Sequence, residues 1–381
     1  MKRFSQQLLP VMFLLVTGIT VSAQDTFRPR YVNSTIYTGI EVGAKGVKLS
    51  VVEIGKNAQS SGAFNILKDT SVNTDFISFT PATFAATLNA VSGLYYTAEH
   101  DYGISSNRIF TVVSSGVKMQ AEKDDKSVWI RNLVDSFKVR IDEPARDVEI
   151  VDVTTEAYLS HLGIVPENRR FNTFLIDIGS GNTKGGFFPE GNTKNFRLFQ
   201  LNWGTKSTAN AAEKRLEDDK SLANYSKQLF RVLTTAENND IIYSVNASGS
   251  YPLSDNIAVS GGIAWSVATL IRPEAAGQTV VPVTYQEVAE FADRIYSDYG
   301  SLNENAFTAK LNLSKADKDI IAKEVKRVNG VFDQKSLMAG TGLLLKIMRQ
   351  FSSAYETKQF FLIKNGQVGW ISAYVDQHTS N

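Results

Sequence analysis

The chain has 381 residues, which is long enough for two lobes with separate hydrophobic cores. Its 40 lysines and arginines nearly balance its 39 aspartates and glutamates, so no strong global field favours nucleic acid or an anionic membrane as a partner. There is no cysteine and there are only three histidines, which excludes disulfides, thiolate metal sites and a cysteine nucleophile. The same composition leaves little for a zinc site or a Ser-His-Asp triad.

The first 23 residues have the pattern of a secretory signal peptide. Lys2 and Arg3 precede an apolar run over residues 8–16, and small residues follow it up to Ala23. The run is short for a membrane span of roughly 20 residues, although an uncleaved anchor is the alternative. We therefore expect cleavage after Ala23, export across the inner membrane to the periplasm, and no membrane span in the mature chain. The absence of cysteine suits an oxidising compartment.

One strand–turn–strand pattern occurs twice. After a lead-in over residues 24–34, residues 36–43 are predicted to form a strand that runs into a glycine turn, and residues 47–54 the next strand. The pattern returns over residues 174–188. The acids near the ends of the first strands, Glu41 and Asp177, are 136 positions apart (177 − 41). So long a repeat predicts two related lobes that face each other, because solenoid repeats span about 20–50 residues.

Strands and helices alternate along the rest of the chain, which predicts an α/β fold. Further strands are expected near residues 108–113, 148–151, 256–259, 360–364 and 368–374. Helices are expected near residues 81–90, 156–162, 205–233, 263–271, 285–296, 315–328 and 336–351. The second of these helices should be capped by Thr154 or Thr155 and stop at Gly163. We place the first lobe at residues 35–168, the second at 169–350, and a C-terminal segment that completes the fold at 351–381.

The two glycine turns are predicted to bind phosphate, because small residues let backbone N–H groups approach it closely. The predicted phosphate-binding residues of the turns are Gly43, Ala44, Lys45, Gly179, Ser180, Gly181, Asn182 and Thr183. A carboxylate at a strand end, such as Asp177 or its counterpart Glu41, suits a hydrated Mg²⁺ or an attacking water. The alternative is a tight hairpin in which Asp177 only caps the turn.

Glu156 and Lys118 are two further candidates. Glu156 is predicted near the start of a helix that precedes the second turn, and at a cleft it would orient or deprotonate a water. The alternative is that it serves only the helix macrodipole. Lys118 is predicted after a strand that leads into a turn, where it would bind phosphate as a point charge. The alternative is a solvated lysine.

These segments, in this order, resemble the exopolyphosphatase/guanosine pentaphosphate phosphatase family (Ppx/GppA), a branch of the actin-like superfamily. Residues 148–159 (VEIVDVTTEAYL) are similar to the family segment that carries its catalytic glutamate, and Glu156 falls on that glutamate. Residues 174–183 (FLIDIGSGNT) are similar to the family's second loop, and Asp177 falls on its aspartate. The resemblance implies a two-lobed actin-like (ribonuclease H-like) fold with a cleft between the lobes, and Mg²⁺ held by Asp177 and Glu41.

The chain departs from the family pattern at its charged positions. The first-loop acid is Glu41 rather than Asp, and Lys184 stands where the family has a metal-associated Glu. Lys118 replaces a phosphate-binding Arg, and the family's closing Arg-Glu-Gly falls near residues 365–367 without its Arg. Because two acids around the expected metal are altered and Lys184 adds positive charge there, we expect weakened Mg²⁺ binding.

Three functions compete on this basis. The leading hypothesis is an exported phosphoanhydride hydrolase that acts on polyphosphate or another phosphorylated small molecule, with water activated by Glu156 and charge neutralised by Lys45, Lys118 and Lys184. The second is a degenerate member that only binds anions or serves as a scaffold. The third is an actin-like ATPase or assembly protein. A homodimer stays open in each case.

Overall fold

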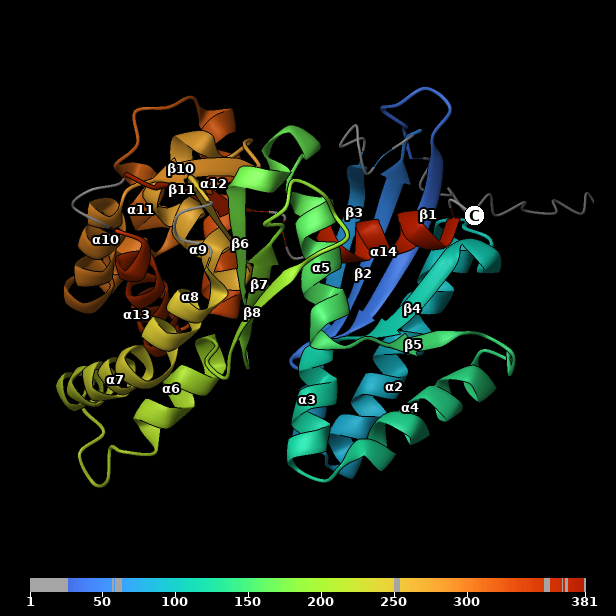
Figure 1. The fold of residues 1–381 in the computed structure, drawn as a ribbon, viewed down its shortest axis with the longest axis horizontal. Coiled ribbons are helices and arrows are strands. Elements are labelled where there is room, and N and C mark those ends of the chain that lie inside the picture. The colour runs from blue at the N-terminus through green and yellow to red at the C-terminus, as the bar shows by residue number, and fades with distance from the viewer. Residues whose placement is uncertain are drawn as a thin grey trace, which may run out of the picture.

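The chain folds into two lobes side by side, each built on one β-sheet with helices around it (Figure 1). The structure is a computed structural model that describes residues 27–56, 58, 64–249, 254–352, 357–364, 366 and 369–379. The two-lobed α/β fold predicted from the sequence is confirmed. The predicted signal peptide at residues 1–23 lies outside the described residues.

The first lobe contains a five-stranded sheet with the order β3-β2-β1-β4-β5. Its strands are β1 (Thr35–Val42), β2 (Gly46–Ile54), β3 (Phe64–Asn73), β4 (Ile109–Val113) and β5 (Val148–Ile150). The first three strands are antiparallel neighbours, whereas β4 runs parallel to β1 and β5 parallel to β4. The helices of this lobe are α2 (Pro81–Tyr96), α3 (Ser115–Lys123), α4 (Ser127–Arg140) and α5 (Val153–Ile164).

The second lobe contains a six-stranded sheet with the order β10-β11-β9-β6-β7-β8. Its strands are β6 (Thr173–Ile178), β7 (Thr183–Phe187), β8 (Arg197–Leu201), β9 (Asn256–Ser260), β10 (Val280–Val283) and β11 (Gln359–Ile363). Its helices are α6 (Thr205–Glu213), α7 (Leu222–Ala236), α8 (Ile242–Ser248), α9 (Gly262–Ile271), α10 (Tyr285–Ser297), α11 (Glu304–Ala309), α12 (Lys315–Val331) and α13 (Gln334–Phe351). The last helix of the chain is α14 (Gly369–Thr379).

The second sheet repeats the first and adds one edge strand. In each sheet an antiparallel three-stranded meander, β1-β2-β3 or β6-β7-β8, is followed by two strands parallel to its first strand. Each sheet has its own hydrophobic core cluster, centred on residues such as Leu49 and Tyr95 in one lobe and Phe174 and Leu344 in the other. The duplication predicted from the spacing of Glu41 and Asp177 is therefore present in the backbone.

Helix α14 returns to the first lobe, where it packs on α5 and the sheet (Figure 1). The two helices come very close at Gly163 and Gly369, because a Cβ on Gly163 would lie 2.0 Å from the Gly369 carbonyl oxygen. The prediction of a strand over residues 368–374 was therefore wrong. The apolar pairs Trp370/Ile371 and Tyr374/Val375 recur four residues apart, which is helical spacing, and all four side chains are buried.

Three other local predictions were also wrong. The helical stretch over residues 205–233 is broken into α6 and α7, with Glu217 between them at a left-handed φ of 49°. Residues 115–123 do not form a turn after the strand but the helix α3. Helix α5 is capped by Asp152, whose carboxylate accepts from the Thr155 amide at 2.7 Å, and the helix continues through Gly163. A carboxylate accepts this bond with a full charge, which favours Asp over Thr.

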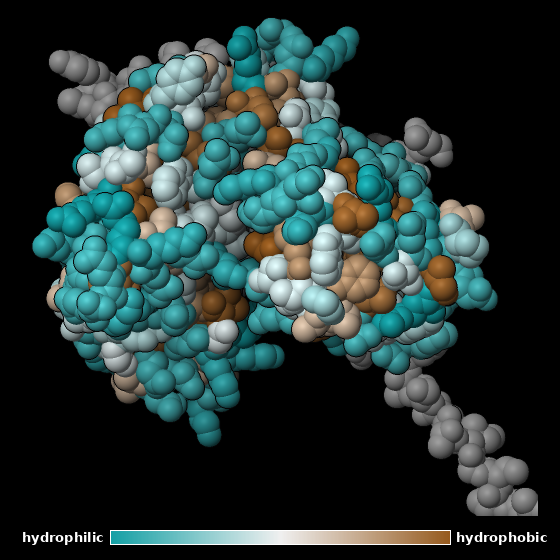
Figure 2. Space-filling view, turned by 90° about the horizontal axis from the view of Figure 1, so that it is seen from below, coloured by the Kyte–Doolittle hydropathy of each residue, from teal (hydrophilic) through white to brown (hydrophobic). Residues whose placement is uncertain are grey.

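The face of the molecule drawn in Figure 2 is mostly hydrophilic. Seen from below, the two lobes form separate bulges on which hydrophobic residues occur mainly in small patches (Figure 2). Within the described part of the chain, no helix is long and apolar enough to cross a bilayer.

Candidate functional site

A cavity of about 720 Å³ lies between the two lobes and is lined by both glycine turns. The structure brings three acids to this cavity that are far apart in the sequence, namely Glu41, Glu156 and Asp177. The predicted phosphate-binding residues that line it are Gly43, Ala44, Lys45, Gly179, Ser180, Gly181 and Asn182. The duplicated hairpins thus face one space.

Two predicted phosphate-binding residues do not line the cavity. Lys118 lies on helix α3 and is not part of the cavity wall. Thr183 is fully buried, and its hydroxyl donates to the carbonyl of Trp203 at 2.7 Å. Thr183 therefore helps to fix β7 to the segment after β8, and its side chain is not presented to a ligand.

Both turns are closed tightly and are held from behind. The Gly43 amide donates to the Gly46 carbonyl at 2.9 Å, and the Gly179 amide donates to the Asn182 carbonyl at 3.0 Å. Amides that follow the third strand of each meander bind the turn carbonyls: Thr74 N to Lys45 O at 2.9 Å, and Lys206 N to Ser180 O at 2.8 Å.

With their carbonyls held in this way, the turns keep other amides free. No hydrogen bond within the described residues uses the backbone N–H groups of Ala44, Lys45, Ser180 or Gly181. Successive unpaired N–H groups in a tight turn form a concave site that suits an anion.

Glu156 is held by groups from both lobes. Its Oε2 accepts from the Ser115 amide, at the first residue of α3, at 2.7 Å. Its Oε1 lies 2.9 Å from Lys184 Nζ, which is also 3.2 Å from Asp177 Oδ2. The side chains of Glu156 and Lys184 are only 4% and 7% exposed, so this is a buried ion cluster rather than a surface salt bridge.

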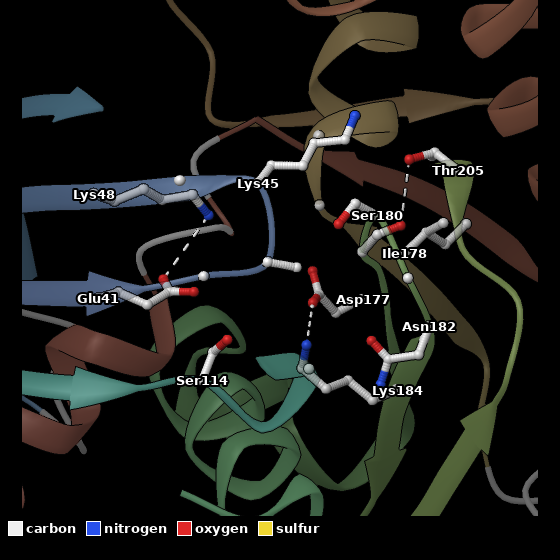
Figure 3. A pocket seen from close by; sticks show the side chains of 18 of the residues that line it. Glu41, Lys45, Lys48, Ser114, Asp177, Ile178, Ser180, Asn182, Lys184 and Thr205 are labelled. Carbon is white, nitrogen blue, oxygen red and sulfur yellow. Dashed lines mark hydrogen bonds and ion pairs between the residues drawn. The ribbon is translucent and has the colours of Figure 1, made fainter. Parts of the chain in front are cut away.

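The other hairpin carries the same kind of pair, in a more open setting. Lys48 Nζ lies 3.8 Å from Glu41 Oε2, and its side chain is 37% exposed. Figure 3 shows Glu41 and Asp177 on opposite sides of the cavity, each joined by a dashed line to the lysine of its own hairpin.

The electrostatics of the cluster follow from this packing. Burial lowers the pKa of Lys184, but the carboxylates of Glu156, Asp177 and Glu41 outweigh burial and raise the pKa above its usual 10.5. Burial raises the pKa of the Glu41 carboxyl, Lys48 opposes this shift, and the charge of Glu156 adds to it. Lys184 therefore stays protonated at any physiological pH.

The carboxylates around Lys184 are not arranged as ligands of a divalent metal ion. The described residues contain no group of three or more acids and histidines arranged to hold one. Asp177 already accepts from Ser260 Oγ at 2.8 Å through Oδ1 and contacts Lys184 through Oδ2. Since Lys184 lies between Asp177 and Glu156, a metal there would meet an ammonium group within ion-pair distance of both carboxylates.

Some groups at the cleft were not predicted from the sequence. They are Lys48, the Ser115 amide and the residues whose contacts join the lobes at the rim of the cleft. There, Lys206 Nζ lies 2.9 Å from Asp75 Oδ1, and Lys45 Nζ lies 5.8 Å from the centre of the Phe332 ring. The role of Lys48 had a signal, because it follows Glu41 by seven positions just as Lys184 follows Asp177. The other contacts depend on how the lobes pack.

Comparisons with known proteins support the fold. No family model and no curated protein matches the sequence. Among solved structures, the Ppx/GppA family member of Aquifex aeolicus is similar with a TM-score of 0.59 and 15% identity, over 91% of this chain and 99% of that one. An exopolyphosphatase from Cytophaga hutchinsonii is similar with a TM-score of 0.55 and 12% identity, over 90% of this chain and 98% of that one. The chain therefore has the two-lobed, actin-like fold of the Ppx/GppA phosphatase structures.

Proposed function

We propose that the protein is an anion-binding module whose cleft holds a phosphorylated small molecule, such as polyphosphate, between the two glycine turns. The observation that carries this proposal is the pair of turns, one from each lobe, that line a single cavity with unpaired backbone amides. Two concave amide sites across a cavity suit a ligand with phosphate groups at more than one position.

Lysines at the cavity supply the complementary charge. Lys45 and Lys123 line it, and neither has a carboxylate within ion-pair distance among the residues that the structure describes. Burial, together with the charge of Lys206, lowers the pKa of Lys45. A bound phosphate would reverse part of that shift, because an anion favours the charged form of the lysine.

Binding is favoured over hydrolysis because of the state of Glu156. A general base needs a free oxygen within hydrogen-bond reach of the attacking water. Both oxygens of Glu156 already accept a hydrogen bond, one from a backbone amide and one from a lysine ammonium. Each donor occupies one carboxylate oxygen, so neither oxygen is without a partner when a water approaches.

Phosphoanhydride hydrolysis is the second candidate, and the position of Glu156 favours it. This acid lines the cavity together with both turns, and a carboxylate retains lone pairs for a water beside its two existing donors. In this version, water attacks the terminal phosphorus, the anhydride P–O bond breaks, and Glu156 orients the water. Solved structures with the same fold that are described as a phosphatase and an exopolyphosphatase support the idea.

The test separates binding from turnover. Calorimetric titration with tripolyphosphate should show one site, and Lys45→Ala should weaken binding by about 10- to 150-fold, because hydrogen bonds to charged groups contribute about 1.5–3 kcal/mol. Lys227→Ala, which changes an exposed lysine of α7, is the matched control. No heat with tripolyphosphate, ATP or pppGpp would reject the binding proposal. A phosphate-release assay with the same compounds and with long polyphosphate, with and without Mg²⁺, decides the second candidate.

We also propose that the protein acts in the periplasm. The signal-like pattern over residues 1–23 supports this, and the mature chain would begin near Gln24. The intact mass of the exported protein should lack residues 1–23. A full-length mass in a membrane fraction would instead indicate an anchor.

A further inference from the structure

The two hairpins carry the same acid–lysine pair at the same register. Glu41 lies opposite Lys48 across the β1–β2 pair, and Asp177 lies opposite Lys184 across the β6–β7 pair. Both lysines follow their acids by seven positions (48 − 41 and 184 − 177), and they are themselves 136 positions apart (184 − 48). The internal repeat therefore preserves the pair as a unit in both lobes.

The lysine of the second lobe, Lys184, also pairs with an acid of the first lobe. Lys184 Nζ bridges Asp177 of its own hairpin and Glu156 of helix α5, at 3.2 and 2.9 Å. Its three donors match a site with carboxylates on two sides. A divalent ion between the facing carboxylates would balance both negative charges, and this ammonium occupies the same position and balances one of them.

We infer that Lys184, with Lys48 as its counterpart in the first lobe, replaces a divalent cation, so that the cleft binds phosphate groups free of metal. This inference rests on the proposed binding function and deepens it by naming the ligand form. Ligands that reach the cleft as metal chelates would have to release the ion, because the carboxylates that would hold it are already paired with lysine. Metal-free polyphosphate and phosphate esters are therefore the ligand class.

One experiment measures metal binding without any ligand. Mn²⁺ is titrated by electron paramagnetic resonance into the wild type, Lys184→Gln, Lys184→Arg and Lys227→Gln. Removing the ammonium leaves Asp177 and Glu156 facing each other without a cation, so Lys184→Gln should gain Mn²⁺ affinity by at least about tenfold. The wild type, Lys184→Arg and Lys227→Gln should all stay weak, because each keeps the positive charge in the cluster.

A second arm measures tripolyphosphate binding to the wild type in excess EDTA and in Mg²⁺. Equal or tighter binding in EDTA supports the inference, whereas affinity that falls more than about tenfold in EDTA overturns it and leaves the binding function standing. Tight binding of Mn²⁺ by the wild type also overturns the inference, and this measurement does not depend on any variant folding correctly. Absence of tripolyphosphate binding in both buffers rejects the proposed function instead, while the Mn²⁺ titrations still test the lysine substitution.

Discussion

Removal of the buried lysine should destabilise the protein strongly. In Lys184→Met, the carboxylates of Glu156 and Asp177 lose the ammonium that lies 2.9 and 3.2 Å away. Breaking a buried ion pair by removing one partner typically costs about 3–5 kcal/mol, because the remaining charge is left without compensation. The chain offers a comparison in Lys48→Met, which should cost less, since Lys48 is 37% exposed and its 3.8 Å contact with Glu41 is near the limit of an ion pair.

Urea unfolding of the two variants and the wild type measures this difference. The Lys184→Met deficit should shrink as the pH falls from 7 to 4, because the uncompensated carboxyls then take up protons. Adding Glu156→Gln and Asp177→Asn to Lys184→Met should recover most of the loss at pH 7, since no buried charge is left over. If Lys184→Met costs no more than Lys48→Met, the cluster is not the electrostatic centre described above.

Three further predictions concern the frame around the site. Glu53 is buried, and although burial acts to raise its pKa, hydrogen bonds from Ser34, Asn65 and two backbone amides lower the pKa from 4.5 to about 2. The ionised Glu53 carboxylate therefore stabilises the fold by up to about 3 kcal/mol above about pH 4.5, and this stabilisation is lost as the pH falls towards 2. In urea unfolding, the stability of Glu53→Gln should approach that of the wild type as the pH falls. Gly163→Ala should cost about 1–3 kcal/mol, because its Cβ would meet the Gly369 backbone, whereas Gly93→Ala on α2, with nothing within 4 Å, should stabilise by up to about 1 kcal/mol. Burial lowers the pKa of His161 from 6.5 to about 4, so the His161→Gln variant should lose less stability than the wild type between pH 6.5 and 4. Equal pH profiles for the wild type and either titratable-group variant, or equal effects of the two glycine changes, would contradict these predictions.

The sequence predicted the elements that are local and periodic. The two hairpins carry their own signal in alternating apolar residues and glycine turns, and their spacing predicted two facing lobes. The helix predicted near residues 285–296 is present as α10, and its start depends only on the capping box of Thr284 and Glu287. Each hairpin and the cap of α10 depend on residues within a few positions of one another.

What the sequence could not predict depends on contacts between distant segments. Lys184 was recognised as a departure from the family pattern, but its contact with Glu156 arises only when α5 packs beside β7. The hydrogen bond from Ser115 to Glu156 is donated by a backbone amide, and such a donor cannot be recognised from the type of residue. Helix α14 was predicted as a strand because its buried residues are apolar on most sides of the helix. The close contact between Gly163 and Gly369, which lets α14 pack on α5, joins residues that are far apart in the sequence and so could not be predicted from it.

Two proposals meet at this cleft, namely that a phosphorylated ligand binds between the two turns and that Lys184 takes the place of a metal. The most direct measurement is a crystal structure of the protein grown with tripolyphosphate and Mg²⁺ together. We expect phosphate density beside the amides of residues 44–45 and 180–181, with Lys184 still bridging Glu156 and Asp177. Phosphate bound elsewhere, or a Mg²⁺ ion coordinated by Asp177 with Lys184 displaced, would contradict it.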